Sequence, residues 1–287
     1  MPYAYLTLSV FAYASYSLFG KAFNLKCEGK KDVSALYNFI LLSCVSLFWG
    51  IIFAFDRSFD PGVLIYSLLF AACFSICNVA LINALKYGPV TLTSLFTGLS
   101  LVMTAIWGFF FWGAKVSVVS VVGLICVAVS IYLCLKRGKD EKSFSFKWLI
   151  FVVIAFISNA GCSIVQRTEQ LEYLGRYGNE MMFFASLIST VAIFVFYIVS
   201  DKSDNKTILK KAWWAPVFAG ISNVALNLLV LLMAITALTP TLIYPTIGVG
   251  GLILITAFST LFFKEKLTKK QWCGFVVGLV AIALLSI

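Results

Sequence analysis

One uncharged stretch limits what this chain can fold into more than any other feature. No residue from Ala212 to Phe263 carries a charge, and most of the stretch is apolar. A helix needs about 20 apolar residues to cross the hydrocarbon of a bilayer, and this stretch is about twice that length. It must fold back once, and the expected break is Thr239-Pro240-Thr241, because proline disfavours helix in the residue before it. The sequence therefore predicts an integral membrane protein.

The composition agrees with that prediction. Of the 287 residues, 61% are hydrophobic and 12% are charged. Soluble domains are usually about 45–50% apolar and about 25% charged. A soluble fold of this length has no means of covering so much apolar surface, whereas lipid removes the need to cover it.

Further uncharged runs follow one another closely along the chain. They predict an all-α integral membrane fold of about ten transmembrane helices. The first helix lacks the basic start and the cleavage site of a secretory signal, so it is interpreted as a retained span. The expected spans are about 3–24, 34–55, 62–85, 90–112, 116–135, 147–166, 178–199, 213–237, 241–263 and 268–287.

The loops between these spans differ sharply in positive charge. Of the 22 Lys and Arg residues, 18 fall in loops after the odd-numbered spans and 4 in loops after the even-numbered ones. Because cytoplasmic loops carry the excess of Lys and Arg, both termini are predicted to be non-cytoplasmic. The net charge of +10 thus follows from membrane flanks, and no nucleic-acid partner is expected.

The two halves of the chain resemble each other. Asn78-Val79-Ala80-Leu81 recurs 145 residues later, and at an offset of 151 residues Gly123 falls on Gly274. Five helices in each repeat would insert the halves in opposite directions, which is a recurrent transporter design. The predicted organisation is a first five-helix repeat over 3–135, a connecting loop over 136–146 and a second five-helix repeat over 147–287.

Three stretches carry a resemblance to a known family: Asn78–Lys115, Asn223–Lys266 and Lys264–Ile287. They resemble the ten-helix EamA-like members of the drug/metabolite transporter superfamily, whose usual topology places both termini in the cytoplasm. Ala114 stands where the first half of that pattern usually has an acidic residue, which Glu265 supplies in the second half. The first span also lacks a deep acidic residue, which argues against proton coupling through a buried carboxylate.

Polar side chains at membrane depth are the candidates for a central substrate cavity. An amide in hydrocarbon is costly unless it is hydrogen-bonded, and tyrosine combines an apolar ring with a hydrogen-bonding tip. Helix–helix hydrogen bonding is the alternative explanation for the same residues. The cavity candidates are Tyr13, Tyr16, Ser17, Asn83, Asn159, Ser163, Asn227, Tyr244 and Thr246.

Glycine and proline mark candidate positions for bending and close packing. Pro245, Gly248, Gly250 and Gly251 predict a gating bend in the ninth span, with a simple packing kink as the alternative. Helix packing is the role predicted for Asn78, Asn223, Gly123, Gly274 and Gly278.

Charged groups near span ends are interpreted as interfacial anchors, because that position costs little. This interpretation covers Lys21, Lys86, Arg167 and Glu180, with a basic pair of Lys21 and Arg167 attracting an anionic substrate as the alternative. The chain has no histidine and eight cysteines, seven of them inside apolar stretches, so no metal site and no cofactor are expected.

These features favour a secondary transporter that moves a small organic metabolite by alternating access between two inverted repeats. The substrate candidates are an amino acid, a sugar or nucleobase derivative, or a drug-like compound. The alternatives are a membrane scaffold or assembly subunit and, against the lack of clustered acids and histidines, an intramembrane lipid-modifying enzyme. The chain is expected in the cell membrane as a monomer or homodimer, with the lipid bilayer and the small-molecule substrate as its partners.

Overall fold

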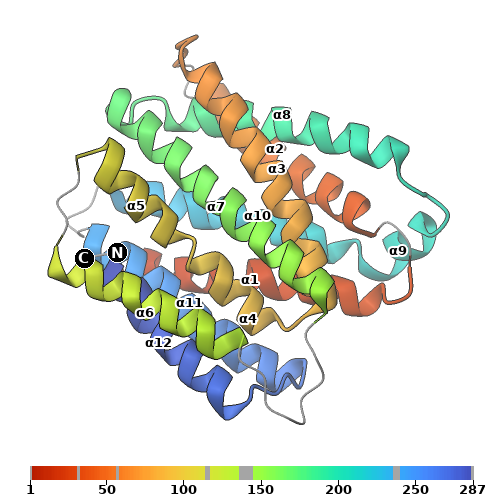
Figure 1. Cartoon of the computed structure of the whole chain (residues 1–287). Coiled ribbons are helices and arrows are strands. Elements are labelled where there is room, and N and C mark those ends of the chain that lie inside the picture. The colour runs from red at the N-terminus through yellow and green to blue at the C-terminus, as the bar shows by residue number, and fades with distance from the viewer. Residues whose placement is uncertain are drawn as a thin grey trace.

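The chain forms a bundle of α-helices. A computed structural model describes residues 2–30, 33–55, 58–113, 117–135, 145–234 and 240–285, and the regular elements in those ranges are all helical. They run in chain order as shown in Figure 1: α1 (Pro2–Lys26), α2 (Val33–Phe55), α3 (Val63–Tyr87), α4 (Val90–Gly98), α5 (Leu101–Phe111), α6 (Val118–Leu135), α7 (Phe146–Glu172), α8 (Gly178–Val199), α9 (Asn205–Ala212), α10 (Trp214–Ala234), α11 (Pro240–Phe262) and α12 (Lys269–Leu285).

Several of these helices are suited to cross a bilayer. Within the described ranges five segments are long and apolar enough, and the bent pair α9–α10 makes a sixth. The five are α2, α3, the interrupted span α4–α5, α7 and α8, while α6 and α11 contain shorter apolar runs. The protein is thus a multi-pass membrane protein. The count of ten spans stays a prediction, and the expected break at Thr239 lies outside the described residues.

Many apolar side chains lie on the outer faces of the helices, as in a membrane protein, rather than in a buried core. Large hydrophobic side chains remain exposed along whole helix faces, which no soluble monomer of this size tolerates. On α6 and α8 the exposed residues include Val118, Val122, Ile125, Val129, Val191, Phe194, Val195 and Ile198. Lipid is the solvent that such faces require.

The helix contacts occur in matched pairs. α3 packs along α7, and α1 packs along α10. α2 lies against α8, α6 against α12, and α4 against α11; the α6–α12 pair is visible at the lower left of Figure 1. When α1 is matched with α7 and α3 with α10, the contact between α3 and α7 corresponds to the contact between α10 and α1.

Glycines bring α6 and α12 close together. A β-carbon on Gly274 would lie 2.7 Å from Cys134 Sγ, and one on Gly278 would lie 2.7 Å from Ser130 Oγ. At the other end of the pair, a β-carbon on Gly123 would lie 3.0 Å from Leu285. The hydroxyl of Ser130 donates a hydrogen bond of 2.7 Å to the Gly274 carbonyl. The two helices therefore run antiparallel with backbones in close approach.

Replacing Gly274 with valine is expected to destabilise the protein by about 1–3 kcal/mol, because the added carbons overpack the backbone of α6. The new β-carbon would meet the Cys134 amide nitrogen at 3.0 Å, and a backbone atom cannot rotate away. The measurement is thermal unfolding of the purified protein in detergent. Val276→Leu is the matched control, since Val276 is 53% exposed on the same helix; equal losses for both variants would contradict the packing role.

Candidate functional site

Lys21 closes one end of the helix bundle. Its ammonium group donates hydrogen bonds to the carbonyls of Leu85, at 3.1 Å, and Gly88, at 2.7 Å, at the end of α3. It also forms an ion pair with Glu265 at 3.8 Å, with side-chain exposures of 13% for Lys21 and 10% for Glu265. Lys21 is therefore not the exposed interfacial anchor expected from its sequence position.

Glu265 joins this contact to the start of α4. Its carboxylate accepts hydrogen bonds from the backbone N–H groups of Val90, at 2.7 Å, and Thr91, at 3.4 Å. The first N–H groups of a helix have no partner within the helix, and the helix dipole favours a negative charge there. Glu265 comes from the segment between α11 and α12, so one carboxylate ties together α1, α4 and α11. We refer to Lys21, Glu265 and the start of α4 as the latch.

A second group of contacts lies beside the latch. The hydroxyls of Thr91 and Ser259 are 2.7 Å apart, which connects α4 to α11. The indole N–H of Trp148 on α7 donates to Thr93 Oγ1 at 3.0 Å. Trp148 is fully buried, and its ring fills the place of the missing side chain at Gly88. This end of the bundle is therefore sealed by packing as well as by charge.

Tyr16 occupies the next position inward along α1. Its hydroxyl donates to Asn78 Oδ1 at 2.5 Å, and the Asn78 amide donates to the Phe74 carbonyl at 2.7 Å. Tyr16 and Asn78 line a small cavity together with Tyr37 and Leu85, and the space open to the centre of a water molecule is about 10 Å³. That is room for about one water molecule.

Tyr13 lies one helical turn further along α1, where three helices meet. A β-carbon on Gly251 of α11 would lie 2.2 Å from the Tyr13 ring, so only glycine admits the ring there. A β-carbon on Gly98, at the end of α4, would lie 3.8 Å from the Tyr13 hydroxyl. Tyr13 and Tyr16 are three residues apart and therefore neighbours on α1, and Lys21 lies further along the same helix at the latch.

The span beside Tyr13 is interrupted at its middle. α4 ends at Gly98 and α5 begins at Leu101, and the intervening Ser100 makes a tight backbone bond to Thr97 O at 3.2 Å. Asn159 of α7 reaches this interruption, where its amide donates to Ser100 Oγ at 2.7 Å and to Thr97 O at 3.2 Å. Interrupted helices with free backbone groups at membrane depth commonly form transporter binding sites.

Replacing Asn159 with alanine is expected to cost about 1–2 kcal/mol of stability, because the α4–α5 interruption loses both donated bonds. The matched control is Asn83→Ala, since the Asn83 amide bonds only to the Val79 carbonyl of its own helix among the contacts described. Thermal unfolding of both variants measures the difference. A loss for Asn83→Ala as large as that for Asn159→Ala would rule out the bridging role.

Other cavity candidates make local contacts. The Ser163 hydroxyl donates to Asn159 O at 3.2 Å, and the Asn227 amide donates to Asn223 O at 2.8 Å. Ser17 is buried at 6% exposure, and Thr246 is half-buried. The structure thus brings Tyr13, Tyr16 and Asn159 to the middle of the bundle, while Asn83, Ser163 and Asn227 bond within their own helices.

The candidate gating glycines face two helices, α12 and α1. A β-carbon on Gly248 would meet Ile282 of α12 at 3.3 Å, and one on Gly250 would meet Val10 of α1 at 3.2 Å. Gly251 faces Tyr13, as described above. α11 is continuous through these positions. The side chains of Tyr244 and Pro245 lie outside the described residues, so the predicted bend stays a prediction.

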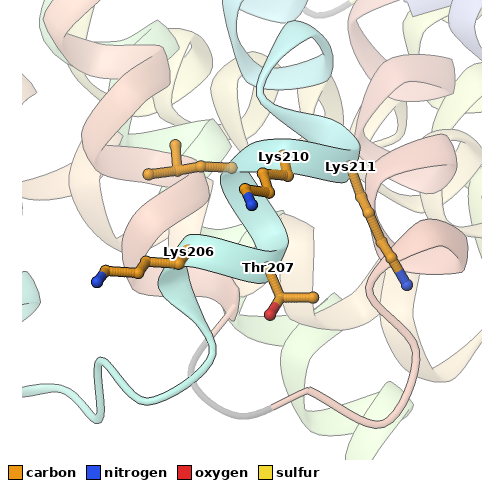
Figure 2. A pocket seen from close by; sticks show the side chains of 5 residues that line it. Lys206, Thr207, Lys210 and Lys211 are labelled. Carbon is orange, nitrogen blue, oxygen red and sulfur yellow. The ribbon is translucent and has the colours of Figure 1, made fainter.

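A hollow at the surface of the chain has a different character. It measures about 370 Å³ and is lined by Lys206, Thr207, Leu209, Lys210 and Lys211, all from α9. Figure 2 shows the lysine side chains spreading away from the short helix. α9 joins α10 at a bend of 62°. Lysines on a short helix at a span end mark a membrane surface, and the hollow is not the central site.

The sequence draws attention to the charged residues near the span ends but does not predict which groups they contact. The family resemblance singles out Glu265 as the acidic residue of the second half, but nothing in the sequence pairs it with Lys21 or places it at the start of α4. Glu180 was expected at an interface, yet it is fully buried and accepts the backbone N–H of Asp60 at 3.1 Å. The signal available in advance was that both acids flank apolar spans.

The architecture and the closed polar end define a class of protein: a helical membrane protein whose middle is lined by polar groups. The comparisons with known proteins are specific about the family. The sequence model of the EamA-like transporter family matches residues 1–136 and again residues 146–287. The chain belongs to the EamA-like transporter family, and it is a membrane transporter of the drug/metabolite transporter superfamily.

Other comparisons add the fold but no activity. One solved structure, described only as the crystal structure of a protein, aligns with 97% of this chain and 97% of its own chain, with a TM-score of 0.57 and 14% sequence identity. At that identity the likeness concerns the fold alone. None of the curated proteins matches this chain.

Proposed function

We propose that this protein is a secondary transporter that moves a small organic metabolite by alternating access between two inverted five-helix halves. Family membership supports transport, and the latch supports the mechanism. Lys21 belongs to the first half and Glu265 to the second, so their ion pair at 3.8 Å connects the halves at one end of the bundle. This contact is the observation that carries the proposal.

The other end differs from the latch. Arg167 on α7 occupies the position that matches Lys21 on α1 when Ser17 is aligned with Ser163. Arg167 is exposed, whereas Lys21 is enclosed. Ala114, where the first half lacks a counterpart of Glu265, lies outside the described residues. The two ends are therefore held by different contacts, and the latch end is closed by its ion pair.

Matched contacts support two halves over 3–135 and 147–287. An offset of 151 residues carries Gly123 onto Gly274 and Cys134 onto Leu285. The close approach of Gly123 to Leu285 then becomes the close approach of Gly274 to Cys134, and both are present. A twofold relation in the plane of the membrane, with the site at the midplane, accounts for this exchange.

The chemistry of the middle favours an uncharged or zwitterionic substrate with hydrogen-bonding groups. Tyr13 and Tyr16 offer aromatic walls and hydroxyls, and Asn159 and Ser100 offer an amide and a hydroxyl. None of these four groups carries a charge at neutral pH. The substrate classes that fit are an amino acid, a sugar or nucleobase derivative, or a drug-like compound.

The lysine-rich loops orient the transporter. The latch and α9 lie on the side of the loops that follow odd-numbered spans, which the positive-inside rule places in the cytoplasm. We therefore place the latch at the cytoplasmic end and both termini outside, in the cell membrane. Reactivity of tags at the two termini with an impermeant reagent on intact cells tests this; tags that react only after permeabilisation would reverse the orientation.

A ligand screen followed by a flux assay tests the proposed function. A metabolite library is screened for compounds that raise the melting temperature of the purified protein, and each hit is then offered, radiolabelled, to proteoliposomes. Uptake that saturates and is inhibited by the unlabelled compound supports transport. Hits that bind without any flux, together with a partner that copurifies in stoichiometric amounts, would favour the scaffold role instead.

A further inference from the structure

A buried carboxyl group lies at the end of the bundle opposite the latch. Glu169 on α7 is fully buried, and neither of its carboxylate oxygens has a hydrogen-bond partner among the described residues. Trp148, which seals the latch end, is on the same helix, about 32 Å away at 1.5 Å per residue. An isolated charge in such surroundings is strongly disfavoured, since neither water nor a donor stabilises it.

A second buried acid lies beside it. Glu180 at the start of α8 interacts electrostatically with Glu169 and is also fully buried. The Glu180 carboxylate accepts the Asp60 backbone N–H with both oxygens, at 3.1 and 3.3 Å. Two neighbouring carboxyl groups resist being charged together. Because among the described residues only Glu180 has a donor, a proton shared by the pair is favoured on Glu169.

The remaining titratable groups around Glu169 do not offer it a positive charge. From α3 comes Tyr66, which donates to Glu172 of α7, and from the segment before α3 comes Asp60. The turn between α7 and α8 supplies Tyr173 and Tyr177. Burial, followed by the charges of Asp60 and Glu172, raises the pKa of Tyr173.

The nearest arginines on the same stretch of chain do not neutralise it either. Arg167 and Arg176 are exposed, and no ion pair joins either of them to Glu169 among the described residues. Arg57 lies outside the described residues. Among the described residues no cation faces the acid pair, and within them only a proton neutralises it.

We propose that Glu169 is a proton-binding site, and that binding and release of this proton are coupled to the change between the two access states. The inference rests on the proposed transport function and gives it an energy source. It also goes against the argument that the lack of a deep acidic residue in the first span disfavours proton coupling, because the buried acid lies near the end of α7 instead.

The position of Glu169 links it to both the site and the opening. α7 carries Asn159, which holds the α4–α5 interruption, ten residues before Glu169. The contact of Glu180 with Asp60 joins the second half to the first at this end. Opening this end would let water reach Glu169, which would then release its proton to that side as a free carboxylate.

Proton occupancy is tested on the purified protein without any substrate. Infrared spectroscopy of the wild type at neutral pH should show the carbonyl band of a protonated, buried carboxyl group, and Glu169→Gln should lack it. Glu172→Gln is the matched control: Glu172 is exposed on the same helix, and its variant should keep the band. A band that persists in Glu169→Gln would overturn the proton site.

Stability against pH gives a second readout. An unfolded chain releases a glutamate proton near pH 4.3, about the ordinary value. A folded state that retains the proton loses stability relative to the unfolded state as pH rises above that value. Wild-type melting should fall by about 3 °C or more relative to Glu169→Gln between about pH 5 and pH 8. Parallel curves would contradict the inference.

Coupling is tested with a transported compound from the screen above. An inward proton gradient should change wild-type uptake at least about threefold, while Glu169→Gln should carry the same compound without responding to the gradient. A gradient response equal to that of the wild type would refute coupling through Glu169. Failure of every compound to cross with wild-type protein would instead refute the transport function, and the infrared result would still decide the proton site.

Discussion

Lys21→Met and Glu265→Gln are each expected to destabilise the protein by about 3 kcal/mol, because either change leaves one enclosed group of the latch without its charged partner. The pair joins the two halves at 3.8 Å with little solvent around it. The double variant should recover part of the loss, since it leaves no unpaired charge. Thermal unfolding of the three variants in detergent measures the coupling energy.

An ion pair at the surface provides the control. Lys30 and Asp204 are 2.8 Å apart, with side-chain exposures of 34% and 23%. Exposed pairs contribute about 0–1 kcal/mol, because water and salt screen them. Lys30→Met should therefore cost much less than Lys21→Met despite the shorter distance. Equal costs, or strictly additive losses in the Lys21 and Glu265 double variant, would show that the latch pair is not coupled.

Opening of the latch should also increase the rate at which nearby buried cysteines react with a maleimide. Cys77 and Cys162 lie near Tyr16 and are each 8% exposed. In the Glu265→Gln variant an impermeant maleimide added from the latch side should label them faster than in the wild type. Cys134, fully buried between α6 and α12, should stay unlabelled in both. Unchanged rates at Cys77 and Cys162 would mean that the latch does not gate this space.

Trp148→Ala is expected to cost about 3–5 kcal/mol, because a large cavity would replace a fully buried ring. The ring packs edge-on against Phe96 at 5.9 Å between centroids and donates to Thr93. Trp148→Phe should cost less, since it keeps an aromatic ring against Phe96 while losing the N–H bond and part of the ring volume. Chemical or thermal unfolding in detergent measures both.

Replacement of a tryptophan outside the seal is the control for Trp148→Ala, because it removes the same type of side chain at a different position. Trp272 on α12 is 42% exposed. Its replacement by alanine should cost much less than that of Trp148, because a large part of the side chain is already exposed. A loss as large as that for Trp148→Ala would indicate that general loss of aromatic surface, and not the seal beside α4, sets the cost.

Much of the architecture could be predicted because the bilayer imposes it. The uncharged runs had to become helices, since a spanning backbone must satisfy its own hydrogen bonds. The repeat around Asn78 and Asn223 indicated two related halves before any coordinates. The amphipathic helix α9 and the interruption at Leu99 and Ser100 were not predicted, because both lie within stretches whose composition resembles their surroundings.

The candidate site was predictable by residue type but not by partner. Tyr13, Tyr16 and Asn159 were singled out as polar groups at membrane depth, and all three lie in the middle of the bundle. The sequence predicts interfacial anchors at Lys21 and Glu180, since a charge near a span end ordinarily faces water. Whether it does depends on which helix ends lie beside it, and this information is absent from the local sequence.

The sequence by itself determined that the chain is helical, crosses a membrane repeatedly and contains two related halves. Those properties depend on composition and on spacing along the chain. Apolar runs partition into lipid, and there the backbone satisfies its own hydrogen bonds by forming helices. Only the tertiary structure decided that Lys21 meets Glu265 across 244 residues of chain, that Asn159 supports an interrupted span and that Glu169 is buried without a hydrogen-bond partner in the part of the chain the structure describes. Each of these depends on the packing of distant helices, because burial and pairing are properties of a side chain's neighbours in space.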